Sequence, residues 1–93
     1  MELTTPTKFL LAQNYPNPFK KGTIIKYSIP DKMTVRLELF DIKGNKLKTL
    51  VNDIKDAGTH REEFKSDGLD EGEYQYKLEC EYYFEIKKMI LLK

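Results

Sequence analysis

The segment Glu73-Tyr74-Gln75-Tyr76-Lys77-Leu78-Glu79-Cys80 alternates between polar and apolar side chains without a break. Successive side chains of a β-strand point to opposite faces of the sheet, so this order predicts a strand with one face in a hydrophobic core and the other in water. The face that we expect in the core carries Tyr74, Tyr76, Leu78 and Cys80.

Further strands follow from the same pattern and from the turn residues between them. They are predicted over residues 9–13, 23–29, 34–42, 59–64 and 82–92. Lys43-Gly44-Asn45 lies between two apolar segments and predicts a hairpin turn, and Pro30 and Ala57-Gly58 mark further strand ends. The side chains that we expect to point into the core are Ile25, Tyr27, Ile29, Val35, Leu37 and Leu39, with Lys26, Ser28, Arg36 and Glu38 on the opposite faces.

Residues 46–54 fit two different structures. Leu47, Leu50, Val51 and Ile54 have the spacing of a helix face, whereas Leu47, Thr49 and Val51 have that of a strand. We favour a strand, because the segment directly follows the hairpin turn and is short for a helix.

The predicted elements define the fold class. About seven short strands separated by turn residues are typical of a β-sandwich, and no alternation of strands with helices suggests a parallel sheet. A chain of 93 residues has room for one hydrophobic core. We therefore expect an all-β, antiparallel β-sandwich of two packed sheets over residues 9–93, preceded by a linker or frayed tail over residues 1–8.

Charge and cysteine content argue against several functions. Sixteen basic and fifteen acidic residues nearly cancel and are interspersed, whereas nucleic acids and anionic membranes select a concentrated basic field. Cys80 is the only cysteine, so neither an intramolecular disulfide nor a cysteine-based metal cluster can form. No apolar segment approaches the roughly 20 residues that cross a bilayer, and residues 9–12 are too few for the core of a signal peptide.

Residues that could support catalysis are few and isolated. His60, the only histidine, lies on a polar strand beside Arg61 and Glu62, and we interpret it as an ordinary strand residue rather than a general base. Cys80 ends an apolar face, which favours a buried, inert thiol over a nucleophile. We expect no enzyme activity and no cofactor.

Two charged clusters remain. Asp67, Asp70, Glu71 and Glu73 could offer oxygen ligands to Ca²⁺, but they lack the Asp-x-Asp-x-Asp-Gly spacing of a calcium loop, so we favour a solvated turn without a metal. Lys87, Lys88 and Lys93 form a small basic cluster near the end of the sequence. These lysines would either protect an edge strand from pairing or contact a partner.

Asn14-Tyr15-Pro16-Asn17-Pro18-Phe19 places two aromatic residues in a loop that its prolines make rigid. Exposed, Tyr15 and Phe19 would form a binding patch; folded back, they would close one end of the sandwich. We favour closure, because burying such a side chain stabilises the fold by about 2 kcal/mol.

Six short motifs, in register from Gln13 to the last residue, resemble the C-terminal sorting domain of type IX secretion. They are the opening Gln13-Asn14-Tyr15-Pro16-Asn17-Pro18-Phe19 with the strand 23–30, then Asp41-Ile42-Lys43-Gly44, Leu50-Val51, Ala57-Gly58-Thr59-His60, Gly68-Leu69-Asp70-Glu71-Gly72-Glu73-Tyr74, and Lys87-Lys88-Met89-Ile90-Leu91-Leu92-Lys93. The sequence departs from that family at Lys20-Lys21-Gly22, at Glu73 and at Cys80-Glu81.

The resemblance implies a function that composition does not. It implies an Ig-like sandwich, similar to the Ig-like domain of flagellar hook-capping proteins, at the C-terminus of a larger protein secreted by Bacteroidota or related phyla. Such a domain folds in the periplasm after Sec export and is recognised by the outer-membrane translocon or its shuttle. A surface sortase commonly removes it and attaches the cargo to lipopolysaccharide. The implied location is the periplasm in transit and then the cell surface or the medium.

The resemblance also suggests roles for individual residues. We predict that Lys87, Lys88, Met89 and Lys93 contact the translocon, by strand addition or docking at a sheet edge. The motif residues predicted to hold the fold are Asn14, Tyr15, Pro16, Asn17, Pro18, Phe19, Asp41, Gly44, Gly58, Gly72 and Tyr74.

Two other functions remain open. One is a non-catalytic accessory module that binds a carbohydrate or protein for a secreted multidomain enzyme. The consecutive Tyr82, Tyr83 and Phe84 would be split between two faces of a strand and make a poor sugar platform. The other is a scaffold like that of a flagellar cap.

Overall fold

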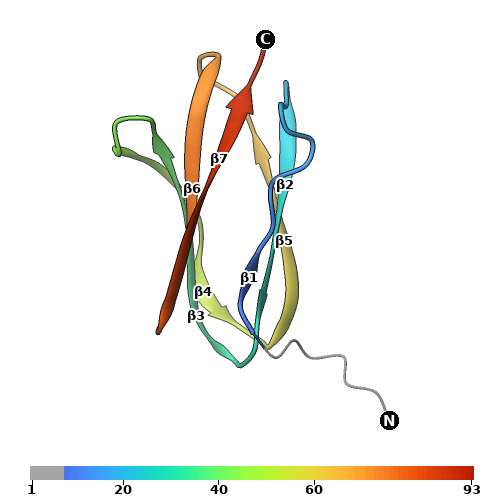
Figure 1. Cartoon of the computed structure of the whole chain (residues 1–93), viewed down its shortest axis with the longest axis vertical. Coiled ribbons are helices and arrows are strands. Elements are labelled where there is room, and N and C mark those ends of the chain that lie inside the picture. The colour runs from blue at the N-terminus through green and yellow to red at the C-terminus, as the bar shows by residue number, and fades with distance from the viewer. Residues whose placement is uncertain (1–7) are drawn as a thin grey trace.

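The computed structural model describes residues 8–93, which form seven strands in two antiparallel sheets (Figure 1). The strands are β1 (Leu10–Leu11), β2 (Gly22–Ile29), β3 (Met33–Asp41), β4 (Lys46–Lys55), β5 (Gly58–Lys65), β6 (Gly72–Cys80) and β7 (Tyr83–Leu91). One sheet has the order β1-β2-β5 and the other β4-β3-β6-β7. The predicted all-β sandwich is confirmed. The greater part of the predicted tail, residues 1–7, lies outside the described residues.

The strand predicted over residues 46–54 is confirmed as β4, and its helix-like spacing has a structural cause. In the pairing of β4 with β3, Leu37 lies opposite Val51 and Glu38 opposite Thr49, so Leu50 has no partner of its own. A second irregularity skips Leu47 in the same way. Each bulge adds one residue to a strand whose side chains otherwise alternate between the two faces of the sheet. Leu47 and Leu50 are the added residues, and they give the apolar positions of β4 the spacing of three and four residues that is typical of a helix.

The core lies between the two sheets. Every side chain predicted to point inward is buried, with exposed fractions of 9% or less. Leu11, Phe19, Phe64, Met89 and Leu91 complete the core together with Val51. Two side chains predicted on the opposite faces are also covered. Ser28 Oγ lies 2.9 Å from Thr59 Oγ1, and a Glu38 carboxylate oxygen lies 3.4 Å from Lys46 Nζ.

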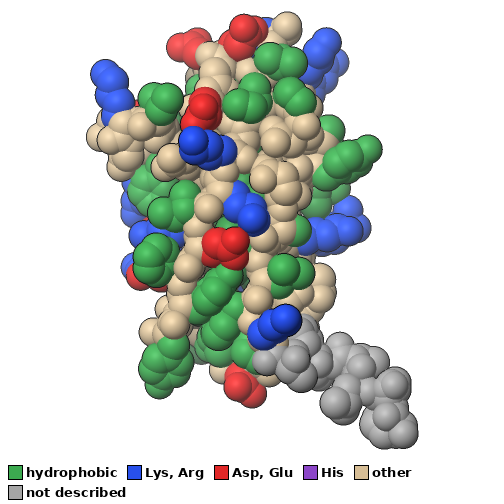
Figure 2. Space-filling model, in the orientation of Figure 1, with side chains coloured by type: hydrophobic (Ala, Val, Ile, Leu, Met, Phe, Trp, Pro, Cys, Tyr) green, Lys and Arg blue, Asp and Glu red, His purple; other side chains and the backbone are tan. Residues whose placement is uncertain are grey.

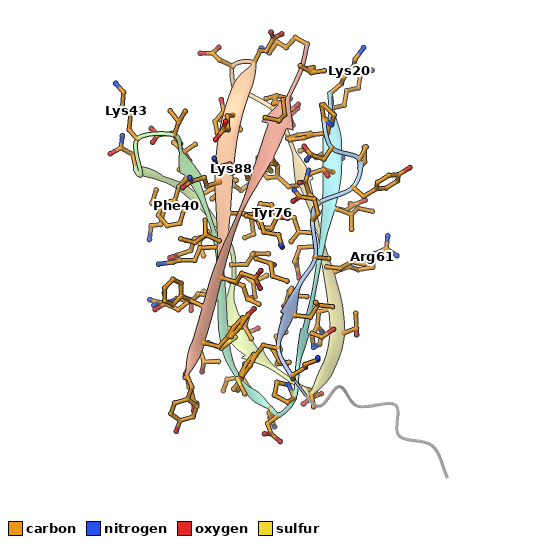
Figure 3. The ribbon with its side chains drawn as sticks, in the orientation of Figure 1. Lys20, Phe40, Lys43, Arg61, Tyr76 and Lys88 are labelled. Carbon is orange, nitrogen blue, oxygen red and sulfur yellow. The ribbon has the colours of Figure 1, made fainter. Side chains whose placement is uncertain are left out.

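Two buried tyrosines differ in their hydrogen bonds. Tyr76 extends from β6 to the segment that follows β1, where its hydroxyl donates to the Ala12 carbonyl at 2.7 Å and accepts from the Asn14 N–H at 2.8 Å. These bonds join one sheet to the other, and burial raises the pKa of Tyr76 to about 12. Figure 3 shows Tyr76 between the sheets. The hydroxyl of Tyr27 on β2 is buried and has no hydrogen-bond partner within residues 8–93.

Tyr76→Phe is expected to lower the free energy of unfolding by about 2 to 4 kcal/mol. The substitution removes two hydrogen bonds and leaves a backbone carbonyl and a backbone N–H without partners in the interior. Urea unfolding of the two proteins, followed by circular dichroism, measures the difference. A loss below about 1 kcal/mol would show that the bonds contribute only as typical exposed ones do.

Tyr27→Phe removes the same atom and is expected to raise the free energy of unfolding by about 1 kcal/mol, because an unpaired buried hydroxyl is costly. The same urea experiment applies, and the two substitutions serve as matched controls for each other. If Tyr27→Phe destabilised the domain as much as Tyr76→Phe does, the difference in hydrogen bonding would have no energetic consequence.

Candidate functional site

The loop over residues 14–19 separates its two aromatic side chains. Phe19 is 1% exposed and packs edge-on against Phe64, with the ring centroids 6.1 Å apart. Tyr15 is 80% exposed. The prediction that the two aromatic side chains fold back and close one end of the sandwich is therefore confirmed for Phe19 and wrong for Tyr15. The reason is that Tyr15 forms a bridge with Ile24, with both N–H···O bonds at 3.0 Å, and its side chain shares the outward face of that residue.

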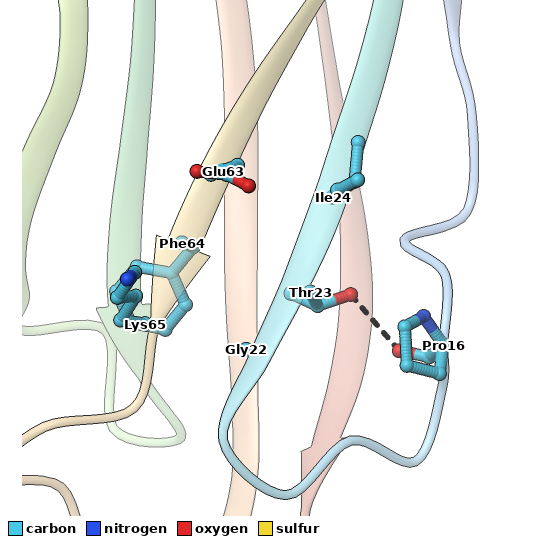
Figure 4. A pocket seen from close by; sticks show the side chains of 7 residues that line it. All are labelled: Pro16, Gly22, Thr23, Ile24, Glu63, Phe64 and Lys65. Atoms are coloured by element: carbon cyan, nitrogen blue, oxygen red, sulfur yellow. Dashed lines mark hydrogen bonds between the residues drawn. The ribbon is translucent and has the colours of Figure 1, made fainter.

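A buried polar cluster fixes the shape of this loop. Asn14 is 2% exposed, and its side-chain amide donates to the Pro16 carbonyl and to Thr23 Oγ1, each at 3.1 Å. The Thr23 hydroxyl donates to the same Pro16 carbonyl at 2.9 Å, as Figure 4 shows. The bonds preceding Pro16 and Pro18 are cis. The cluster ties the loop to β2.

The loop also covers part of the free edge of β7. Phe19 runs parallel to the end of β7: its N–H donates to the Ile90 carbonyl at 2.9 Å, and its carbonyl accepts from the Leu92 N–H at 2.8 Å. The Ile90 N–H donates to Asn17 Oδ1 at 2.9 Å, and Gln13 Nε2 donates to the Lys88 carbonyl at 2.6 Å. The last part of β7 is therefore closed to a further strand.

The first part of β7 is open. The strand β7 is the last of its sheet, and Ile90 points its backbone groups away from β6. Alternate residues of a strand point their backbone groups to the same side, so those of Lys88, Ile86 and Phe84 also point away from β6. Among residues 8–93, nothing binds the outward N–H and C=O of Phe84 and Ile86, or the N–H of Lys88. The side chains of Phe84 and Ile86 are 65% and 48% exposed. We call residues 84–88 the open segment.

The structure divides the four residues predicted to contact the translocon. Lys88 and Lys93 are exposed and Lys87 is partly exposed. Lys87 lies 3.3 Å from Glu85 and Lys88 lies 3.6 Å from Glu73, in each case measured from Nζ to a carboxylate oxygen. Met89, in contrast, is 0% exposed and belongs to the core. Its side chain therefore holds the folded domain together and is not presented to a partner.

The remaining motif residues lie in turns or at the strand ends beside them. The Asp41 carboxylate accepts hydrogen bonds from the backbone N–H groups of Lys43 and Asn45, both at 2.9 Å, and this lowers the pKa of Asp41. Gly44 has φ +92°, a conformation that other residues rarely adopt. Tyr74 donates its hydroxyl to the Asp70 carbonyl at 2.6 Å. Gly58 and Gly72 begin β5 and β6.

The aromatic residues at the start of β7 face different ways. Tyr83 stacks on Phe9, with ring centroids 4.5 Å apart and planes 5° from parallel. Tyr82 is 89% exposed, and Phe84 is exposed on the outer face of the sheet. They form no continuous flat platform.

His60 and Cys80 lie in different surroundings. His60 Nε2 is 2.8 Å from the Asp56 carbonyl, and its ring lies against Tyr27. Cys80 is buried, which raises the pKa of its thiol. Within residues 8–93, no three His, Cys, Asp or Glu side chains gather closely enough to hold a metal ion. This part of the chain also has no helix long and apolar enough to cross a membrane.

Charges on the visible face of the molecule are mixed. Figure 2 shows basic, acidic and apolar side chains interspersed over this face, with no concentrated basic area. The interspersed charges of the sequence are thus kept in the fold.

Comparison with known proteins identifies the family of this chain. The family model described as the secretion system C-terminal sorting domain matches residues 13–92. A comparison with curated proteins finds no match. The matched region extends from the loop that closes the sandwich to the end of β7. The chain therefore belongs to the family of secretion system C-terminal sorting domains, the sorting signals of type IX secretion.

Proposed function

We propose that this domain is a folded export signal and that the type IX translocon recognises it at the open segment of β7. Membership of the sorting-domain family indicates a larger cargo protein that is exported to the cell surface or the medium. The observation that carries the proposal for β7 is the unpaired backbone of Phe84 and Ile86 beside a fully paired Ile90.

Strand addition is the mode of recognition that this geometry supports. An extended segment of the translocon pairs with the outward backbone groups of the open segment, and these hydrogen bonds supply affinity. Phe84, Ile86 and Lys88 point to the outer face of the sheet and supply specificity. Of the four residues predicted to contact the translocon, Lys88 lies on this face, whereas Met89 is buried and is dropped from the set.

Charged side chains on the other face limit unselective pairing. Glu85 and Lys87 alternate with Phe84 and Ile86 and so point toward the inner face of an edge strand. Charges in that position discourage edge-to-edge aggregation. A correct partner must accommodate the Glu85–Lys87 ion pair, whereas an arbitrary apolar strand would cover both charged side chains without replacing their contacts with water.

Recognition by this route depends on folding. Lys88 and Ile90 belong to a single strand, and only the folded loop over residues 14–19 closes the end of that strand while leaving its start open. An unfolded chain has no such defined edge. The translocon thus selects domains that have completed their sandwich. After transport, a surface sortase removes the domain from the cargo.

Ile86→Pro is expected to block export of a reporter fused ahead of residues 9–93 in a type IX-competent cell. Proline removes the outward N–H, which the domain itself does not use, and its ring obstructs an added strand. The fraction of reporter at the cell surface and in the medium measures the effect, and we expect it to fall at least about tenfold, equivalent to about 1.4 kcal/mol of binding.

Ile86→Thr is the matched control, since it keeps both the N–H and the β-branched shape and should retain export. Thermal unfolding of the purified variants establishes that both fold. Normal export of the folded Ile86→Pro variant would refute strand addition at the open segment. A wild-type fusion that stays in the periplasm would refute the export signal itself. Substitution is preferable to deletion of residues 87–93, which would remove the core residues Met89 and Leu91.

A further inference from the structure

A second surface lies on the outer face of the three-stranded sheet, away from β7. A hollow of about 340 Å³ is lined by Ala12, Gln13, Tyr15, Ile24, Lys26 and Arg61. A second hollow of about 200 Å³, shown in Figure 4, lies next to it and is also lined by Ile24. The first hollow is at the lower end of the range of small-molecule sites, about 300 to 1,000 Å³.

Two cations face each other in this hollow. Lys26 and Arg61 are directly opposite across β2 and β5, and both side chains are exposed. Like charges in this position repel each other and weaken a sheet. The nearest acidic residue on the same face of β5 is Glu63, two pairs further along, but no carboxylate among the described residues lies within 4.0 Å of either cation. A bound anion would relieve the repulsion, and a guanidinium matches a carboxylate with two parallel hydrogen bonds.

Tyr15 adds a flat apolar surface to the charged pair. Its backbone is fixed by the two bonds to Ile24, yet its side chain is 80% exposed. An exposed ring held on a rigid backbone loses little conformational freedom when it contacts a ligand. The ring of Tyr15 can therefore receive the face of a ligand ring whose anionic group reaches Lys26 and Arg61.

Gln13 restricts the chemistry of the ligand further. Its amide nitrogen already donates to Asn14 Oδ1 at 2.7 Å and to the Lys88 carbonyl at 2.6 Å. Its amide oxygen has no donor among residues 8–93. Gln13 is exposed, so this oxygen is open to water. Since it can only accept, a ligand hydroxyl can take the place of water there, whereas an ether or ester oxygen cannot.

We propose that this hollow binds a sugar ring that carries a carboxylate, as in a hexuronic acid. The carboxylate lies between Lys26 and Arg61, the ring lies on Tyr15, and a hydroxyl donates to Gln13. The cations and the ring of this hollow belong to the three-stranded sheet and the loop, whereas β7 lies in the other sheet. Gln13 is the one contact that the two surfaces share, because its amide nitrogen donates to the Lys88 carbonyl.

The test is a titration of the full 93-residue chain with sodium glucuronate, followed by the NMR amide and arginine side-chain signals. Saturable shifts at Tyr15, Lys26 and Arg61 are expected. Glucose and sodium acetate, at matched ionic strength, are expected to give at least about tenfold weaker binding, because each lacks one half of the recognised group. Equal binding of acetate would overturn recognition of the ring, and equal binding of glucose would overturn the role of the cations.

Arg61→Gln and Tyr15→Ala are each expected to weaken glucuronate binding at least about tenfold. Lys43→Gln is the matched control, since Figure 3 shows Lys43 on the opposite side of the molecule from Arg61. Both Arg61 and Tyr15 are exposed, so the dispersed spectrum of the folded domain should remain. Non-saturating shifts, or equal weakening in the Lys43→Gln protein, would refute the site.

Discussion

The hydroxyl of Tyr76 holds the segment on which the rest of the structure depends. It binds the Ala12 carbonyl and the Asn14 N–H, and so fixes the chain where it leaves the small sheet. From that point the loop carries Phe19 into the core and along β7. Without this anchor the segment would be connected to the four-stranded sheet only through the contacts of Gln13, Asn17 and Phe19 with β7.

The same segment divides β7 into a closed part and an open part. Phe19 and Asn17 occupy the backbone groups of Ile90, whereas those of Phe84 and Ile86 have no partner among the described residues. A single structural element thus completes the core and limits where another strand can be added. This link gives a physical reason for a sorting signal to be a folded domain and not a short peptide: the surface to be recognised exists only when distant parts of the chain have met.

The sequence predicted the strands well because alternation is a local property. The lysines near the end of the sequence suggested an edge strand, but the sequence could not predict which part of that strand would be open, because the pairing of Phe19 with β7 is a long-range contact. The burial of Met89 was within reach, because Met89 and Leu91 share a strand face. The different positions of Tyr15 and Phe19 could not be predicted, because a loop has no periodicity from which the direction of a side chain follows. The opposition of Lys26 and Arg61 likewise required the register of β2 with β5, two strands that are distant in the sequence.

Native-state hydrogen exchange tests the central claim most directly. If the loop is an integral part of the fold, the amide protons of Asn14, Phe19 and Ile90 will exchange with the same free energy as those of β6, through global unfolding. The amide protons of Phe84 and Ile86 will exchange at rates close to those of an unstructured chain. Exchange of Phe19 and Ile90 through a local opening of much lower free energy would show that the loop detaches from β7, and the account would then be wrong.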